Sequence, residues 1–262
     1  MSLVPLESTL QRLRQSWLGD WLGLPAVWRD CVSQLGGVDM QTAPIDAVAL
    51  TLAQELEQHG QQLGPDEPPY HNRLHFADAL VCLTALLLKQ RAMSPEAQAK
   101  GLSWTEGLML LAMLGHDAWH PGRRNASAAE LERRSAEAVT DRMAQAGLAL
   151  SAQREVGALI LATALDVEPT PTQASAPFEM SALDSRAMLV READVLASAL
   201  PRFGGQLTQA LADEWARQDQ AHHAPVPCEQ VRAGFLRQVA LFASPPAQAL
   251  GLPALVARQL AA

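Results

Sequence analysis

The segment from Ser103 to Asp117 constrains the fold most strongly, because it predicts a buried helix that ends on two side chains able to bind a metal. Ser103 and Glu106 have the spacing of a capping box, in which a serine hydroxyl and a glutamate carboxylate satisfy backbone amides at the helix start. The apolar run LMLLAML follows and leads directly into His116 and Asp117. A nitrogen ligand and an oxygen ligand are therefore expected together at the inner end of a buried helix.

The rest of the chain also has helical character, and no segment shows the clear alternation of apolar and polar residues that marks a strand. Further helices are expected over residues 45–59, 74–90, 127–146, 151–165 and 181–200. Ser127, Ser151 and Ser181 are expected to cap the last three, and Gly147 and Pro201 to end two of them. The predicted fold class is all-α.

Length and charge limit the organisation and the partners of the chain. With 262 residues, we expect one catalytic domain over residues 61–262 and a helical N-terminal elaboration, residues 1–60, packed on its core. The net charge of -8 argues against nucleic-acid polymers and anionic membranes as partners. No apolar run approaches the roughly 20 residues of a membrane span, and the N-terminus lacks the apolar region of a secretory signal. A cytoplasmic protein is expected.

The three cysteines, Cys31, Cys82 and Cys228, are isolated in the sequence. They have neither the spacing of a disulfide framework nor that of a thiolate zinc site. Metal ligands in this chain are therefore expected to come from histidine and carboxylate side chains.

The segment YHNRLHFAD carries a second group of candidate ligands. His71 and His75 are four residues apart and Asp78 follows three residues later, so a helix places all three on one face. Two imidazoles and a carboxylate in this arrangement can bind a metal or divide the roles of ligand and proton donor. The alternative is a capped helix start with surface histidines.

Two further residues extend the candidate site. His120 follows Asp117 closely, and the turn at Pro121 and Gly122 allows its ring to face the same cavity. Asp194 lies on the apolar face of its expected helix, where a carboxylate is costly unless it is paired or bound to a metal. For Asp194 alone, a metal ligand and a buried aspartate paired with arginine or a backbone donor remain equally open.

Taken together, the strings YHNRLHFADAL, HDAWHPGRRN and EADVL resemble, in this order, the motifs of class I cyclic nucleotide phosphodiesterases in the HD superfamily of metal-dependent phosphohydrolases. Residues 160–163 also resemble the ILAT string of that family, and the resemblance covers roughly residues 70–199. It implies an HD-domain helical bundle. It also implies an enzyme that hydrolyses a phosphodiester bond of a small, possibly cyclic, nucleotide by attack of a metal-activated hydroxide.

The resemblance further implies a dinuclear metal centre. The first ion, Zn, Fe, Mn or Co, would be held by His75, His116, Asp117 and Asp194. Asp117 would bridge to a second ion, Mg or Mn, held mainly by water. His71 corresponds to the general acid, while His120 and Glu132 would lie near the waters of the second ion. Residues implied to support these groups by hydrogen bonds are Asn72, Asp78, Asn125 and Thr163.

The nucleotide pocket departs from the pattern of that family, which reads its base with a glutamine and a phenylalanine on a late helix. Here Gln230 and Phe235 are five residues apart, and Gln238 and Phe242 are four apart, and neither spacing matches. By default, both phenylalanines are expected in the core and both glutamines in solvent. The candidate substrate contacts are Tyr70, Asn72, Gln230, Phe235 and Gln238.

Three other functions compete with a phosphodiesterase. The first is a broader HD phosphohydrolase that acts on nucleoside mono- or triphosphates. The second is a non-catalytic HD module that binds a ligand, which the complete set of ligands opposes. The third is a di-iron oxygenase, which the phosphodiesterase-like strings oppose. The segment with Trp17, Trp21 and Trp28 is expected either in the core or at the interface of a homodimer.

Overall fold

The computed structural model describes residues 3–94, 101–165, 177–217 and 229–261, and these residues form α-helices and one short 3-10 turn without any strand. The helices are α1 Leu3–Trp17, α2 Leu24–Gln34, α3 Ala43–Leu63, α4 Arg73–Met93, α5 Trp104–Gly115, α6 Glu130–Gln145, α7 Leu150–Leu161, α8 Leu183–Ala199, α9 Gly204–Arg217, α10 Glu229–Gln238, α11 Pro245–Ala249 and α12 Leu252–Ala261. The prediction of an all-α fold is confirmed. Among the described residues, no helix is long and apolar enough to cross a membrane.

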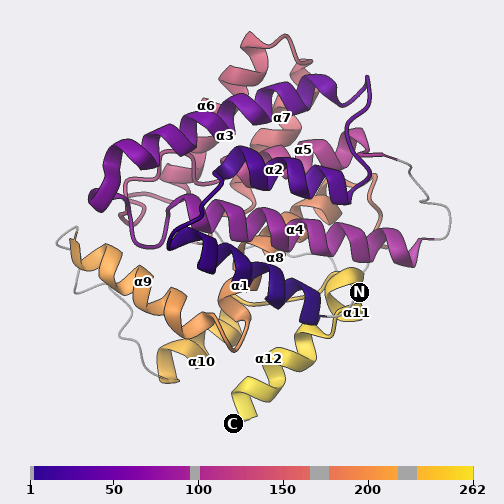
Figure 1. Cartoon of the computed structure of the whole chain (residues 1–262). Coiled ribbons are helices and arrows are strands. Elements are labelled where there is room, and N and C mark those ends of the chain that lie inside the picture. The colour runs from indigo at the N-terminus through magenta and orange to yellow at the C-terminus, as the bar shows by residue number, and fades with distance from the viewer. Residues whose placement is uncertain (1–2, 95–100, 166–176, 218–228, 262) are drawn as a thin grey trace.

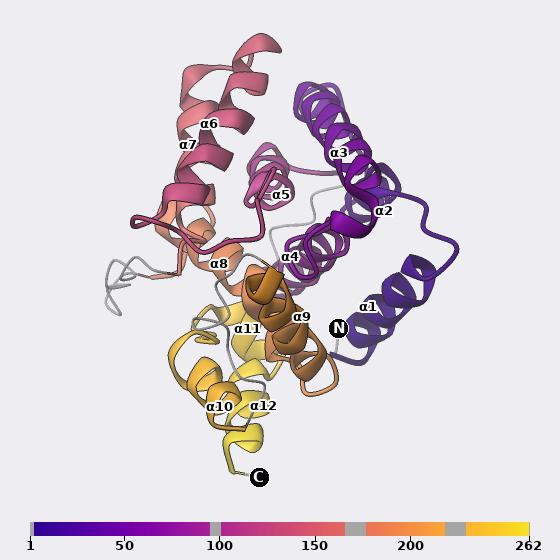
Figure 2. The same ribbon diagram turned by 90° about the vertical axis from the view of Figure 1, so that its left-hand side faces the viewer.

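Helix α4 is the centre of the fold (Figures 1 and 2). Its residues 75 to 87 are all buried, because α1, α2, α5, α8 and α11 pack around it. Helix α5 is likewise buried along residues 106 to 115. Helices that are apolar on all sides belong in the interior. The start of α4 and the end of α5, which carry the two histidine motifs, therefore meet inside the molecule.

The outer helices cover this centre on several sides. Helices α6 and α7 run side by side, α2 and α3 form a second pair, and α9 to α12 gather at the C-terminal end (Figure 2). One apolar cluster reaches from Leu6 in α1 to Val256 in α12. The domain boundary expected at residue 60 falls inside α3, so the N-terminal helices share this core.

Two of the three N-terminal tryptophans, Trp21 and Trp28, contribute to the core. Trp28 is fully buried, and its indole nitrogen donates to Asp46. Trp21 donates to Glu57 and packs edge-on against Trp17. Cys31 and Cys82 are buried free thiols, whereas Cys228 lies outside the described residues.

Of the four serines expected to cap helices, only Ser103 does so in the described residues, where it forms the predicted capping box with Glu106. The predictions were wrong for the other three, Ser127, Ser151 and Ser181. Helix α6 begins later than expected because Ala129 adopts a left-handed conformation, with φ of 49°. The carboxylate of Glu130 is bound instead by Arg123 and by the Ala126 amide.

A buried ion pair joins α1 to α4. The guanidinium of Arg14 donates to both oxygens of Asp78, at 3.0 and 2.7 Å, and the Asp78 side chain is only 3% exposed. Arg14 also lies 4.4 Å from the centre of the Phe203 ring. The expectation that Asp78 orients a histidine was wrong, because α1 covers this face of α4 and supplies the partner.

We expect Arg14→Ala to lower the free energy of unfolding by about 3–5 kcal/mol, because it leaves a buried carboxylate without its cation. Burial already raises the pKa of Asp78 despite the arginine. The double variant Arg14→Ala/Asp78→Ala should recover part of the loss, since no charge then stays buried. Urea unfolding followed by circular dichroism measures both, with the exposed Arg12→Ala on the same helix as control. Equal losses in the single and the double variant would contradict this account.

Candidate metal centre

Four side chains from three parts of the fold converge between α4, α5 and α8. His75 lies in the first turn of α4, His116 and Asp117 directly follow α5, and Asp194 projects from α8. The start of α4 is fixed by Asn72, whose side-chain oxygen accepts from the amides of Leu74 and His75. Asn72 thus positions His75 through the backbone, not through a bond to its ring as the resemblance implied.

The side-chain nitrogen and oxygen atoms of these residues lie close to one another. The Nε2 atoms of His75 and His116 are 3.1 Å apart, and Asp117 Oδ2 lies 3.2 and 3.0 Å from them. Asp194 Oδ1 lies 3.6 and 3.3 Å from the same two nitrogens. Ligand atoms about 2.0–2.2 Å from one ion are roughly 3.0–3.6 Å from their neighbours in tetrahedral or octahedral geometry. His75, His116 and Asp117 therefore form a group close enough to hold one ion, and Asp194 lies beside its two histidine nitrogens.

The protonation of His116 supports this interpretation. Its Nδ1 donates to the carbonyl of Met113 at 2.8 Å, so Nε2 is the ring atom that faces the cluster. Burial opposes a charge on His116, but Asp117 and Asp194 outweigh burial and hold its pKa well above the usual value. Burial likewise opposes the charge of Asp117, yet its histidine neighbours hold its pKa well below the usual range. The cluster thus attracts positive charge.

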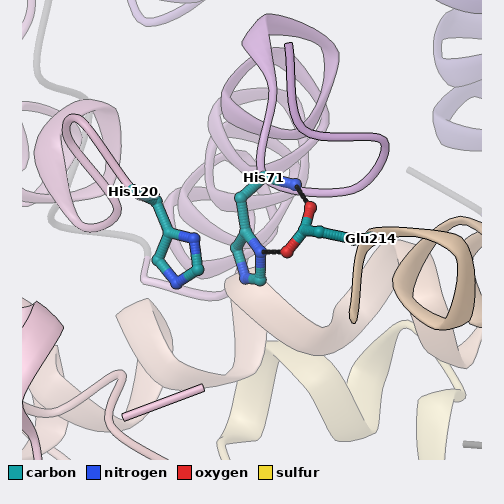
Figure 3. A group of neighbouring side chains, drawn as sticks. All are labelled: His71, His120 and Glu214. Atoms are coloured by element: carbon teal, nitrogen blue, oxygen red, sulfur yellow. Dashed lines mark hydrogen bonds and ion pairs between the residues drawn. The ribbon is translucent and has the colours of Figure 1, made fainter. Parts of the chain in front are cut away.

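A second group lies beside the first and contains a residue that the sequence did not indicate. Glu214 of α9 is almost fully buried, and its Oε2 accepts from the backbone amides of Tyr70 and His71 at 2.9 and 2.8 Å. Its Oε1 pairs with Nδ1 of His71 at 2.5 Å (Figure 3). These bonds fix the His71 ring with Nε2 directed to the cluster of candidate ligands, 3.8 Å from Asp117 Oδ2.

His120 completes this second group. Its ring stacks on His71, with the centroids 3.6 Å apart (Figure 3). Its Nδ1 accepts from the amide of Gly122. Burial disfavours a charge on His71, but Glu214 and Asp117 outweigh it and raise the pKa of His71. Burial and the neighbouring His71 lower the pKa of His120 to about 3. His71 therefore holds the proton of the pair, and His120 stays neutral.

The group of His71, His120 and Glu214 is also close enough to be considered as a metal site. Imidazole nitrogens bind metals in the plane of the ring, so two stacked rings cannot both direct a lone pair at one ion. Their arrangement suits the transfer of a proton better than the binding of a metal.

Tyr70 packs against two of these histidines, His71 and His75. Its ring centroid lies 4.7 Å from that of His71 and 4.9 Å from that of His75, and its hydroxyl bonds to Ser198. Burial and the nearby carboxylate of Asp194 raise the pKa of Tyr70, so its hydroxyl stays neutral. Tyr70 therefore helps to fix the rings, and its role as a substrate contact remains a prediction.

Other predicted residues have partners of their own. The amide of Asn125 donates to Glu132, at 2.9 Å, and its oxygen accepts from the amide of Leu131. The Thr163 hydroxyl donates back to the carbonyl of Ile160, at 2.7 Å. The implied role of Glu132 near the waters of a second ion remains a prediction, as do the implied supporting roles of Asn125 and Thr163.

The late helix α10 does not supply the cavity walls next to the histidines. Gln230 and Gln238 are exposed, and Phe235 packs against the apolar core, as the default expectation had it. Instead, a cavity of about 400 Å³ opens beside His120 and Glu214. A space of about 20 Å³ next to it reaches His71.

Comparison with known proteins adds no assignment, because no family model and no curated protein matches the chain.

Proposed function

We propose that the protein is a metal-dependent hydrolase of phosphodiester bonds in small nucleotide substrates. The observation that carries this proposal is the position of the Glu214–His71 pair, a fixed proton donor next to four convergent metal ligands. A site that only binds a ligand does not require such a donor. The histidine and carboxylate ligands, without a thiolate, suit Zn, Fe, Mn or Co.

The metal ligands would divide their roles according to position. Divalent ions held by His75, His116, Asp117 and Asp194 would polarise a phosphoryl oxygen and lower the pKa of the attacking water. Asp117 is the carboxylate nearest to both groups, since its Oδ2 lies 3.2 Å from His75 and 3.8 Å from His71. Its other oxygen makes it the residue best able to contact a second ion, Mg or Mn.

His71 would give its proton to the departing oxygen. Glu214 accepts at Nδ1 and stabilises the positive charge, so the proton to be transferred sits on Nε2, the atom on the side of the metal centre. His120 covers the other face of the ring and remains uncharged. Once a phosphodiester is bound to the ions, its leaving group would lie within reach of this proton.

The test is an assay of the purified protein with bound metals quantified by mass spectrometry. Substrates are cyclic AMP, cyclic GMP, bis(p-nitrophenyl) phosphate and nucleoside mono- and triphosphates, each with added Mn²⁺ or Mg²⁺. We expect cleavage of at least one phosphodiester, loss of activity with EDTA and recovery when the ion is restored. Cleavage of mono- or triphosphates alone would favour the broader phosphohydrolase. Bound metal without cleavage of any phosphate ester would refute a hydrolase.

A further inference from the structure

The cavity of about 400 Å³ beside His120 and Glu214 has the size of a small-molecule site. Its walls are largely apolar and flat, with one indole, three prolines and a leucine, namely Trp119, Pro68, Pro69, Pro121 and Leu63. Three charged side chains line the wall, and one of them, Asp66, is an exposed carboxylate. Glu214 binds His71, and the Arg217 guanidinium donates to the carbonyls of Pro65 and Glu67. The cavity therefore suits an uncharged, planar part of a ligand better than a phosphate.

Trp119 is held in this wall in an unfavourable backbone conformation. Its φ is 56°, in the left-handed region that bulky side chains avoid, and it lies between Asp117 and His120 in the metal motif. The Arg142 guanidinium lies 4.3 Å from the centre of the indole and is itself paired with Glu55. Strain that the surrounding structure maintains is typical of functional sites. The indole is thus a preorganised surface, supported by Arg142 and in contact with both cavities.

His59 supplies a polar group to the same walls. It projects from α3, is half-buried and lines both the large cavity and the small space next to His71. In the described part of the chain, no side chain or backbone group forms a hydrogen bond with its ring. An unpaired imidazole in an apolar wall is available to the edge of a heterocycle, because it offers one donor and one acceptor.

From these observations we propose that the cavity binds the planar heteroaromatic ring of the substrate, with Trp119 as the stacking surface and His59 as the group that bonds to the edge of the ring. The link between this ring and a phosphodiester rests on the proposed function. The affinity of the cavity for a free nucleoside does not, because it requires neither metal nor catalysis. The ring would then occupy the side of the site next to His71 and His120, where the leaving group departs.

The experiment is a calorimetric titration of the full-length, metal-free protein with adenosine, guanosine and cytidine, and with ribose as a ligand that lacks the ring. We expect nucleosides to bind and ribose not to bind. Trp119→Gly should weaken binding about tenfold or more, the range of base–aromatic stacking. It should also retain the fold, since glycine accepts the positive φ. Trp119→Phe should lose less, and His59→Ala should weaken binding severalfold. Trp104→Ala, at a half-exposed tryptophan outside both cavities, is the matched control.

The outcomes separate this inference from the proposed function. Nucleoside binding that depends on Trp119, without hydrolysis of any phosphate ester, would leave the ring site standing and remove the hydrolase. Phosphodiester hydrolysis with no nucleoside binding, or with binding unchanged in folded Trp119→Gly and His59→Ala, would overturn the ring site alone. If Trp119→Gly does not fold, Trp119→Phe and His59→Ala decide, and unchanged affinity in both contradicts the inference.

Discussion

Asp117→Asn is expected to remove the tightly bound ion and to reduce phosphodiester hydrolysis about a thousandfold. The Asp117 oxygen lies within 3.2 Å of both histidine nitrogens, so its charge is central to the cluster. The loss corresponds to several kcal/mol of charge stabilisation in the transition state, at about 1.4 kcal/mol for each tenfold. Metal content by mass spectrometry and kcat/KM with Mn²⁺ measure the two effects.

A thermal unfolding experiment gives an independent readout of the same site. An ion that binds only the folded state stabilises it. The wild-type protein should therefore gain in melting temperature on addition of Mn²⁺, and Asp117→Asn should not. Asp141→Asn, on the exposed face of α6, is the matched control and should keep metal, activity and the Mn²⁺ response. Full metal content and activity in Asp117→Asn would show that this cluster is not the catalytic centre.

The set of candidate ligands was predicted from the resemblance of three sequence strings, because local signals alone left the roles of His75 and Asp194 open. His116 and Asp117 follow an uninterrupted apolar run, which predicts a buried helix whose end lies in the core. Asp194 occupies an apolar face, and that periodicity places a carboxylate in the interior. Local periodicity indicates which side chains face the core, but it does not show which of them meet there.

Glu214 could not be found in this way. It lies 143 residues after His71. Nothing in the sequence of α9 distinguishes the buried Glu214 from its exposed acidic neighbour Asp213. The pairing of Arg14 with Asp78 was missed for the same reason, because the two residues are 64 positions apart. Such long-range pairs depend on how outer helices dock on α4. The left-handed turns at Trp119 and Ala129 were also missed, because neither residue type predicts a positive φ.

Glu214→Gln is expected to reduce kcat about a hundredfold for substrates with an alkoxide leaving group, while the bound metal is retained. The glutamate stabilises the proton on His71. Burial favours a neutral Glu214, but the charge of His71 outweighs burial and lowers the pKa of Glu214. A glutamine keeps the shape and can still accept from the backbone amides, but it removes this charge. General acid catalysis typically contributes 10²–10⁴-fold.

The leaving group distinguishes proton donation from a merely structural effect. A p-nitrophenolate departs without a proton, so Glu214→Gln should change kcat little for bis(p-nitrophenyl) phosphate and much for an alkyl phosphodiester such as a cyclic nucleotide. His71→Ala should show the same selectivity, and the two effects should not add, because Glu214 acts through His71. Asp213→Asn, the exposed neighbour bonded only to Gln209 among the described residues, is the control. Equal losses of kcat on both substrates, with metal retained, would mean that Glu214 shapes the site without assisting the proton transfer.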